Sequence, residues 1–196
     1  MRSRSFLVWF CLCVVAFLTG CRKSGELPHF GRVPAFSMKD QDGKPFSEDS
    51  VRGSVWAAAF VFTRCPTACP RVTRAMKDVQ LDAKKRNLAL RLVSFSIDPD
   101  NDTPEVLSKY AKEYDADTST WTFATGNLAD VQKTAEHGFK IAVEGTADPS
   151  KAGFGINHGT QLVLVDPELE IRGYYSTSDP AALTKVVEDA GTLAAR

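Results

Sequence analysis

The chain has 196 residues, of which 43% are hydrophobic and 24% are charged, with 24 basic and 24 acidic side chains. This length suits one domain, and the hydrophobic share is sufficient for a sizeable core. The balanced charge excludes the basic excess expected of a nucleic-acid-binding protein, so we expect no nucleic-acid partner. The sequence contains no internal repeat and no low-complexity tract.

The N-terminus has the features of an export signal. A short basic region is followed by an uncharged apolar stretch of thirteen residues, Phe6–Leu18, and by the small residues Thr19-Gly20 before Cys21. The stretch is too short for a membrane-spanning helix, which needs roughly 20 apolar residues. We therefore predict that residues 1–20 are a cleaved lipoprotein signal peptide, because Leu-Thr-Gly-Cys resembles a lipobox, and that Cys21 is lipidated. An uncleaved signal anchor is the alternative.

A tether is expected between this leader and the body of the protein. From Arg22 to Pro34 the chain has two glycines and two prolines but little periodic apolar content. We expect residues 21–33 to be the membrane tether and residues 34–196 to form the domain. The protein is thus expected to be an exported, membrane-anchored lipoprotein that faces the periplasm or the cell exterior.

The hydrophobic pattern of the first half of the domain predicts a hairpin and then a crossover. The hairpin turns at Asp42-Gly43 and is followed by an apolar run, Val55–Phe62, that is typical of a strand buried on both faces. A helix is expected after Pro70, ending at Arg86, and a second strand over Leu90–Ile97. Strand, helix and strand in this order predict two parallel neighbours in one sheet.

The second half adds further strands and helices. In chain order, we expect a helix that begins at Pro104 and is capped by Thr103, a strand Trp121–Ala124, a helix capped by Asn127 and ending at Gly138, a short strand Phe139–Val143, a loop with three glycines up to His158, strands Gln161–Val165 and Ile171–Tyr175, and a helix Pro180–Ala190. The whole predicts an α/β fold: a thioredoxin-like sandwich with a central mixed sheet, flanking helices and an N-terminal hairpin.

Two of the five cysteines, Cys65 and Cys69, lie outside the leader and its lipobox. In an exported protein such a pair is ordinarily a structural disulfide, but a bridge across so short a segment removes little chain entropy. The pair follows the first buried strand, so we expect the start of a helix, with Arg64 and Arg71, to stabilise a thiolate. Residues four apart share one helical face, so both sulfurs could reach one partner, either each other or a metal.

Two thiolates favour Cu(I) or zinc, and an added imidazole makes a three-coordinate copper site possible. Of the three histidines, His29 lies in the tether and is expected to be solvated. His137 is expected in the last turn of a helix, where a cation suits the helix dipole. His158 follows the glycine-rich loop and is expected on the rim of the domain. From the residues alone, its role as a ligand stays open.

Three segments together resemble the Sco/SenC family. They are Phe62–Pro70, which contains both cysteines; Ser96–Pro104, which reads Ser-Ile-Asp-Pro-Asp-Asn-Asp-Thr-Pro; and His158 with the strand that follows it. The likeness runs from about Ala35 to the C-terminal helix. It implies a membrane-tethered, thioredoxin-like domain that binds copper and helps to assemble the copper centre of cytochrome c oxidase.

The same resemblance carries over the ligand set to Cys65, Cys69 and His158. It also implies a partner, which is the copper-bearing subunit of the oxidase or another copper or thiol protein. The family often has Asp before this histidine and Ser after it, whereas this chain has Asn157 and Gly159. That departure concerns the groups that orient the imidazole more than ligation itself. Because a flexible segment is expected before His158, we also expect the imidazole to close over copper and to open for release.

The acidic stretch and the residues before the cysteines exclude two further functions. Asp98, Asp100 and Asp102 alternate as in a calcium loop, but Thr103 and Lys109 stand where an EF-hand needs Gly and Glu, so a strand-to-helix turn is expected. A peroxiredoxin is excluded, because neither cysteine is preceded by the required Pro-x-x-x-Thr-x-x spacing. Two function classes stay open: a copper metallochaperone, which is not an enzyme, and an exported thiol-disulfide oxidoreductase that acts through the cysteine pair.

Overall fold

The computed structural model describes residues 26–146 and 155–196. The predicted signal peptide and Cys21 lie outside the described residues, and so do residues 147–154 of the predicted loop. Within the two described ranges, no helix has the length and apolar character needed to cross a membrane.

The centre of the fold is a mixed sheet of five strands in the order β5-β4-β3-β8-β9. Its strands are β3 (Val55–Val61), β4 (Leu90–Ser96), β5 (Trp121–Ala124), β8 (Gln161–Val165) and β9 (Ile171–Ser176). Strands β3, β4 and β5 are parallel, whereas β8 runs antiparallel to β3 and β9 antiparallel to β8. The parallel strands therefore end at the same edge of the sheet, which is where the cysteines follow.

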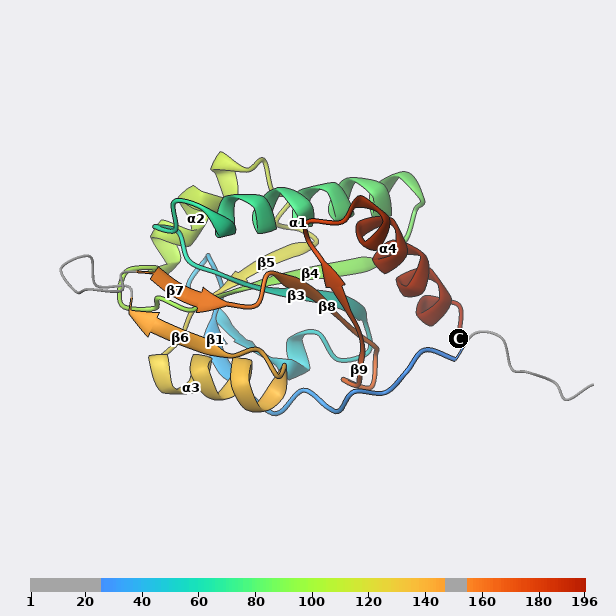
Figure 1. The fold of residues 1–196 in the computed structure, drawn as a ribbon, viewed down its shortest axis with the longest axis horizontal. Coiled ribbons are helices and arrows are strands. Elements are labelled where there is room, and N and C mark those ends of the chain that lie inside the picture. Colours follow the sequence, from blue (N-terminus) through green and yellow to red (C-terminus); the bar gives the residue numbers. More distant parts are fainter. Residues whose placement is uncertain (1–25, 147–154) are drawn as a thin grey trace, which may run out of the picture.

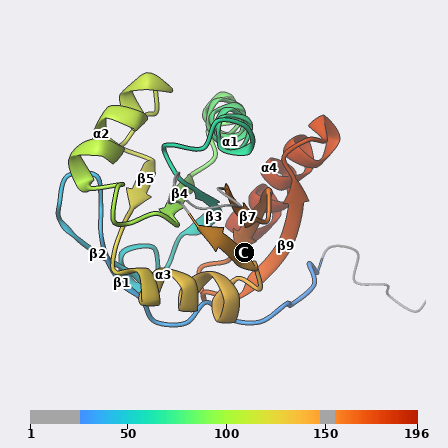
Figure 2. The same ribbon diagram turned by 60° about the vertical axis from the view of Figure 1, so that its left-hand side comes forward.

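Helices cover both faces of this sheet. They are α1 (Ala68–Lys85), α2 (Pro104–Glu113), α3 (Leu128–Lys133), which continues as a π-helical turn over Thr134–Gly138, and α4 (Pro180–Ala194). Figures 1 and 2 show α1, α2 and α4 on one side of the sheet and α3 on the other. A small hairpin of β1 (Ser37–Lys39) and β2 (Pro45–Ser47) precedes the sheet. This is the thioredoxin-like sandwich that the sequence predicts.

An aromatic cluster fills the side of the sheet that faces α3. The ring of Phe139 lies 5.8 Å from that of Trp56, 5.3 Å from that of Phe60 and 5.7 Å from that of Phe95, measured between centroids. All four side chains are fully buried. Because Phe139 comes directly after the π-helical turn, its burial anchors the end of that segment against the sheet.

Two expectations about the segment before β8 are wrong. The strand expected over Phe139–Val143 does not form at residues 139–142: the N–H groups of Phe139 and Ile141 donate to carbonyls of the preceding helical turn, so they are not available to a neighbouring strand. The expected loop up to His158 is instead framed by two antiparallel strands, β6 (Val143–Thr146) and β7 (Gly155–His158). Val143 pairs with His158, so the histidine ends a strand rather than a free loop.

Part of the predicted tether lies against the domain. The backbone of residues 30–33 exchanges hydrogen bonds with that of residues 169–171, at N···O distances of 2.7 to 2.9 Å. Arg172 donates to the carbonyl oxygens of Leu27 (2.6 Å) and Pro28 (3.0 Å), and its guanidinium also pairs with Asp166 at 2.7 Å. Residues 27–33 are thus bound along β9, while the boundaries of leader, tether and domain stay a prediction.

Candidate dithiol and metal centre

Both cysteines lie in the turn that leads from β3 into α1. The helix begins at Ala68, so Cys69 is in its first turn, whereas Cys65 lies three residues before the helix and not in its first turn. Thr67 occupies the N-cap position but makes no hydrogen bond through its side chain. The Cys69 N–H donates instead to the Cys65 sulfur, at 3.4 Å. A thiol thus takes the place that a side-chain oxygen usually fills at a helix start.

The environments of the two sulfurs differ. Cys65 is 8% exposed and Cys69 is fully buried, and both are free thiols. Burial opposes ionisation of Cys65, but the backbone N–H groups of Cys69, Thr67 and Ala68 and the Cys69 thiol together lower its pKa. Burial strongly raises the pKa of Cys69, against a hydrogen bond from the Phe62 N–H at 3.4 Å, and the charges of Cys65 and Asp102 add to the rise. Both thiols are therefore buried, but Cys65 ionises more readily than Cys69, which keeps its proton.

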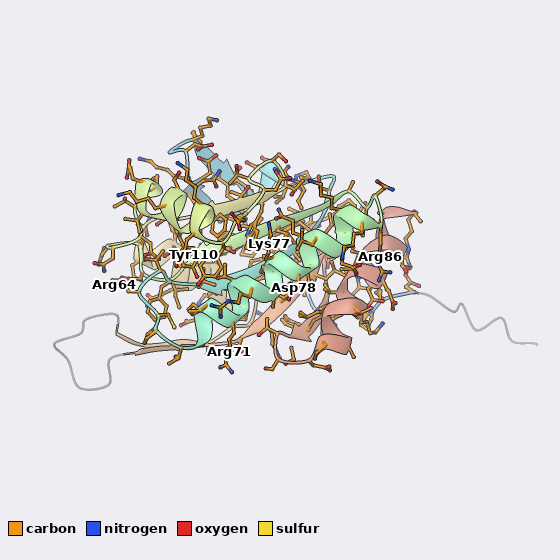
Figure 3. All side chains as sticks on the ribbon, turned by 90° about the horizontal axis from the view of Figure 1, so that it is seen from above. Arg64, Arg71, Lys77, Asp78, Arg86 and Tyr110 are labelled. Atoms are coloured by element: carbon orange, nitrogen blue, oxygen red, sulfur yellow. The ribbon has the colours of Figure 1, made fainter. Side chains whose placement is uncertain are left out.

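The two arginines contribute less positive charge than the sequence suggests. The guanidinium of Arg64 donates to one oxygen of Asp98, at 3.1 Å from Nε and 2.8 Å from Nη2. Its charge is therefore matched by a carboxylate that is 5% exposed. Arg71 lies on the exposed side of α1, with its side chain directed away from the ribbon (Figure 3). The hydrogen bonds at the helix start, rather than arginine charge, lower the pKa of Cys65.

The acidic stretch after β4 forms the strand-to-helix turn that the sequence predicts. Thr103 caps α2 by accepting a hydrogen bond from the Val106 N–H, and Pro104 is the first helical residue. Asp98 and Asp102 are buried, and each binds the turn that carries the cysteines: Asp98 through Arg64, and Asp102 through Thr63. This support was not predicted from the sequence. A signal was available, since residues that follow neighbouring parallel strands meet at one edge of a sheet.

The three histidines lie in different parts of the fold. His29 is exposed in the segment along β9, and His137 is exposed in the π-helical turn after α3. His158 ends β7, and Figures 1 and 2 show the β6–β7 hairpin at the end of the molecule where α1 begins. The side chain of His158 lies outside the described part of the structure. Among the side chains that are described, no three from His, Cys, Asp and Glu are grouped as metal ligands.

Comparison with known proteins places this geometry in a family. Residues 26–190 match the sequence profile described as SCO1/SenC. The chain belongs to the SCO1/SenC family. The match begins just before the segment bound along β9 and includes both cysteines, the acidic turn and His158.

Three similar proteins illustrate the relationship. The SCO1 protein homolog of Bacillus subtilis (strain 168) is 33% identical over 158 residues, which are 80% of this chain and 80% of that protein. A putative copper-binding protein of Stutzerimonas stutzeri is 31% identical over 151 residues, covering 76% of this chain and 71% of the relative. The solved structure of BsSco, in which a disulfide switch was identified, has a TM-score of 0.76 and 29% identity and covers 89% of this chain and 99% of BsSco. BsSco is described as a member of the Sco family of cytochrome c oxidase assembly proteins.

Proposed function

We propose that this protein is a membrane-tethered copper-binding metallochaperone that assists assembly of the copper centre of cytochrome c oxidase. The observation that carries the proposal is the pair of free thiols, Cys65 and Cys69, joined by an N–H···S hydrogen bond at a helix start. Support also comes from the family, since one relative is named a putative copper-binding protein and BsSco is described as an oxidase assembly protein.

The donor set suits copper as a cargo. Thiolate sulfur is a soft ligand that favours Cu(I), and an imidazole nitrogen makes the site suitable for either oxidation state. Cys65 has a lowered pKa and can bind first, whereas the buried thiol of Cys69 must lose its proton as the metal enters. His158 is the proposed third ligand. Lipid on Cys21 is the proposed link to the membrane of an exported protein, and the copper-bearing subunit of the oxidase is the proposed recipient.

The test is copper binding by the reduced protein. We expect one copper per chain, loss of binding in Cys65→Ser and Cys69→Ser, and a changed spectrum of bound copper in His158→Ala. His137→Ala is the matched control, because His137 is exposed after α3, on the face of the sheet opposite α1. Equal copper binding by the protein with a Cys65–Cys69 disulfide would show that the proposed site is wrong, since a disulfide cannot supply two thiolates.

The second candidate is an exported thiol-disulfide oxidoreductase. The contrast between the two thiols favours it, because a cysteine with a lowered pKa next to one with a raised pKa is typical of dithiol exchange. The disulfide switch identified in BsSco agrees with such chemistry. The His158→Ala variant separates the two functions: an oxidoreductase that works through the cysteines keeps its exchange rate, whereas a copper chaperone loses transfer of copper to its acceptor.

A further inference from the structure

A buried carboxylate binds the turn that carries the thiols. Asp102 is fully buried, and it accepts hydrogen bonds from Thr63 and Ser96. Oδ2 of Asp102 accepts from the Thr63 N–H at 3.1 Å and from the Ser96 hydroxyl at 2.6 Å. Oδ1 accepts from the Thr63 hydroxyl at 2.5 Å. These contacts join the end of β4 to the residues that follow β3.

The groups that bind this carboxylate are all donors, and in the described structure all of them are neutral. Arg64, the nearby cation, is paired with Asp98. A buried carboxylate without a cation is costly, and burial accordingly raises the pKa of Asp102. An asparagine would fit the space but offers only one acceptor oxygen and adds two donors. A carboxylate suits this position because both of its oxygens can accept, one from the Thr63 hydroxyl and the other from the Thr63 N–H and the Ser96 hydroxyl.

Thr63 transmits this restraint to both cysteines. It is the residue between Phe62, whose N–H donates to the Cys69 sulfur at 3.4 Å, and Arg64, which precedes Cys65. The Phe62 carbonyl accepts from the Cys65 N–H at 3.3 Å. When Asp102 binds the backbone N–H and the side chain of Thr63, it fixes the peptide between Phe62 and Thr63, whose carbonyl accepts from Cys65, and it restrains the adjacent Phe62 N–H, which donates to the Cys69 sulfur.

We propose that Asp102 is a positioning residue which, through Thr63, holds Cys65 and Cys69 in a fixed relative position. In that position the two sulfurs can either form a disulfide with each other or bind one copper ion together. The copper part rests on the proposed function, and the disulfide part does not. If Asp102 no longer holds the turn, the two sulfurs are less well preorganised both for disulfide formation and for copper binding, because each of these requires the sulfurs in one relative position.

The test compares Asp102→Asn with Asp189→Asn. Asp189 is a matched control, because it is a buried carboxylate that accepts from the Tyr175 hydroxyl at 2.7 Å and from Lys185 at 2.9 Å, on a helix that does not carry the thiols. The first measurement is the equilibrium constant for forming the Cys65–Cys69 disulfide against glutathione. We expect it to fall about tenfold in Asp102→Asn, a change of about 30 mV in reduction potential, and to stay within about twofold in Asp189→Asn.

The second measurement is Cu(I) affinity in competition with a chromophoric chelator, where we expect a similar loss of about tenfold, or about 1.4 kcal/mol. Thr63→Val removes only the hydroxyl donor, so the logarithms of the disulfide equilibrium constant and of the Cu(I) affinity should change by about half as much as in Asp102→Asn. This variant provides the test if Asp102→Asn does not fold. Adding Asp102→Asn to Thr63→Val should then have a smaller effect than in the wild type.

The outcomes are distinguishable. If Asp102→Asn or Thr63→Val lowers the melting temperature as Asp189→Asn does, yet leaves the disulfide equilibrium unchanged, the role of Asp102 is only structural and the proposal is overturned. If the wild-type protein binds no copper but the disulfide equilibrium changes as expected, the proposed function fails while the positioning role of Asp102 stands.

Discussion

Replacing Arg172 with methionine should release the N-terminal segment from the domain. Arg172 and Asp166 form an ion pair at 2.7 Å whose side chains are 4% and 5% exposed, so water screens it little. The same guanidinium donates to the carbonyl oxygens of Leu27 and Pro28. Methionine keeps most of the aliphatic stem but removes the charge and every one of these donors.

The expected loss of stability follows from the burial. Removing one partner of a buried ion pair leaves an uncompensated charge and typically costs about 3–5 kcal/mol. For a domain of this size, about 1 kcal/mol shifts the melting temperature by 2–4 °C, so Arg172→Met should melt about 10 °C lower. The double variant Asp166→Asn/Arg172→Met also removes the negative charge of Asp166, so no buried charge is left unpaired there. The amide oxygen of the asparagine can still accept from the N–H groups of Glu168 and Glu170. The double variant should therefore recover part of the loss.

Thermal and urea unfolding followed by circular dichroism give the stability, and limited trypsin digestion reports on the segment. Cleavage after Arg32 should become faster in Arg172→Met, because the backbone around it is bound along β9 in the wild type. Arg52→Met is the matched control: its ion pair with Asp49 is exposed, at 46% and 73%, and such pairs contribute about 0–1 kcal/mol. If Arg172→Met unfolds within about 1 kcal/mol of the wild type, the reasoning about the buried pair is refuted.

Three further outcomes are expected. Because the pKa of Cys65 is lowered and that of Cys69 is raised, iodoacetamide should modify Cys65 alone in the folded, reduced protein. The rate of modification should have a pH midpoint below the usual thiol value of about 8.5. Mass spectrometry that finds Cys69 modified first would contradict this. Phe139→Ala should lower the free energy of unfolding by about 3–5 kcal/mol, because the ring is fully buried among three aromatic neighbours, and urea titration measures it. Thr103→Ala should cost only about 1 kcal/mol, the usual effect of losing a helix cap, and a loss above about 3 kcal/mol would mean that Thr103 does more than cap α2.

Features encoded within one segment could be predicted from the sequence. The unbroken apolar run after Ser54 identifies β3, because only a strand buried on both faces needs no polar position. Thr103 and Pro104 mark the start of α2, because each fits a helix N-terminus by its own chemistry. The junction of strand and helix at Cys65 and Cys69 follows from the same local patterns, so the candidate dithiol can be predicted without knowledge of the tertiary contacts.

Features that depend on pairing between segments could not be predicted in the same way. The β6–β7 hairpin forms by backbone hydrogen bonds between short, glycine-containing strands, which show no clear alternation of apolar and polar residues. The sequence predicts a strand that begins at Phe139, yet the Phe139 ring belongs to the aromatic cluster and its N–H donates to the preceding turn. In both cases tertiary contacts outweigh the local pattern.

The support of the dithiol shows how topology joins distant residues into one site. Thr63 and Asp102 are 39 positions apart, yet Thr63 lies two residues beyond β3 and Asp102 lies in the turn that follows β4, and these two strands are parallel and adjacent. The crossover through α1 brings β4 beside β3 in the same direction, so whatever follows β4 meets whatever follows β3. The chain places two thiols after the first strand and a buried acceptor after the second. A dithiol at this edge therefore gains its restraint from the neighbouring strand, whereas His158 enters by a separate hairpin whose register, with Val143 opposite the histidine, sets where its backbone lies.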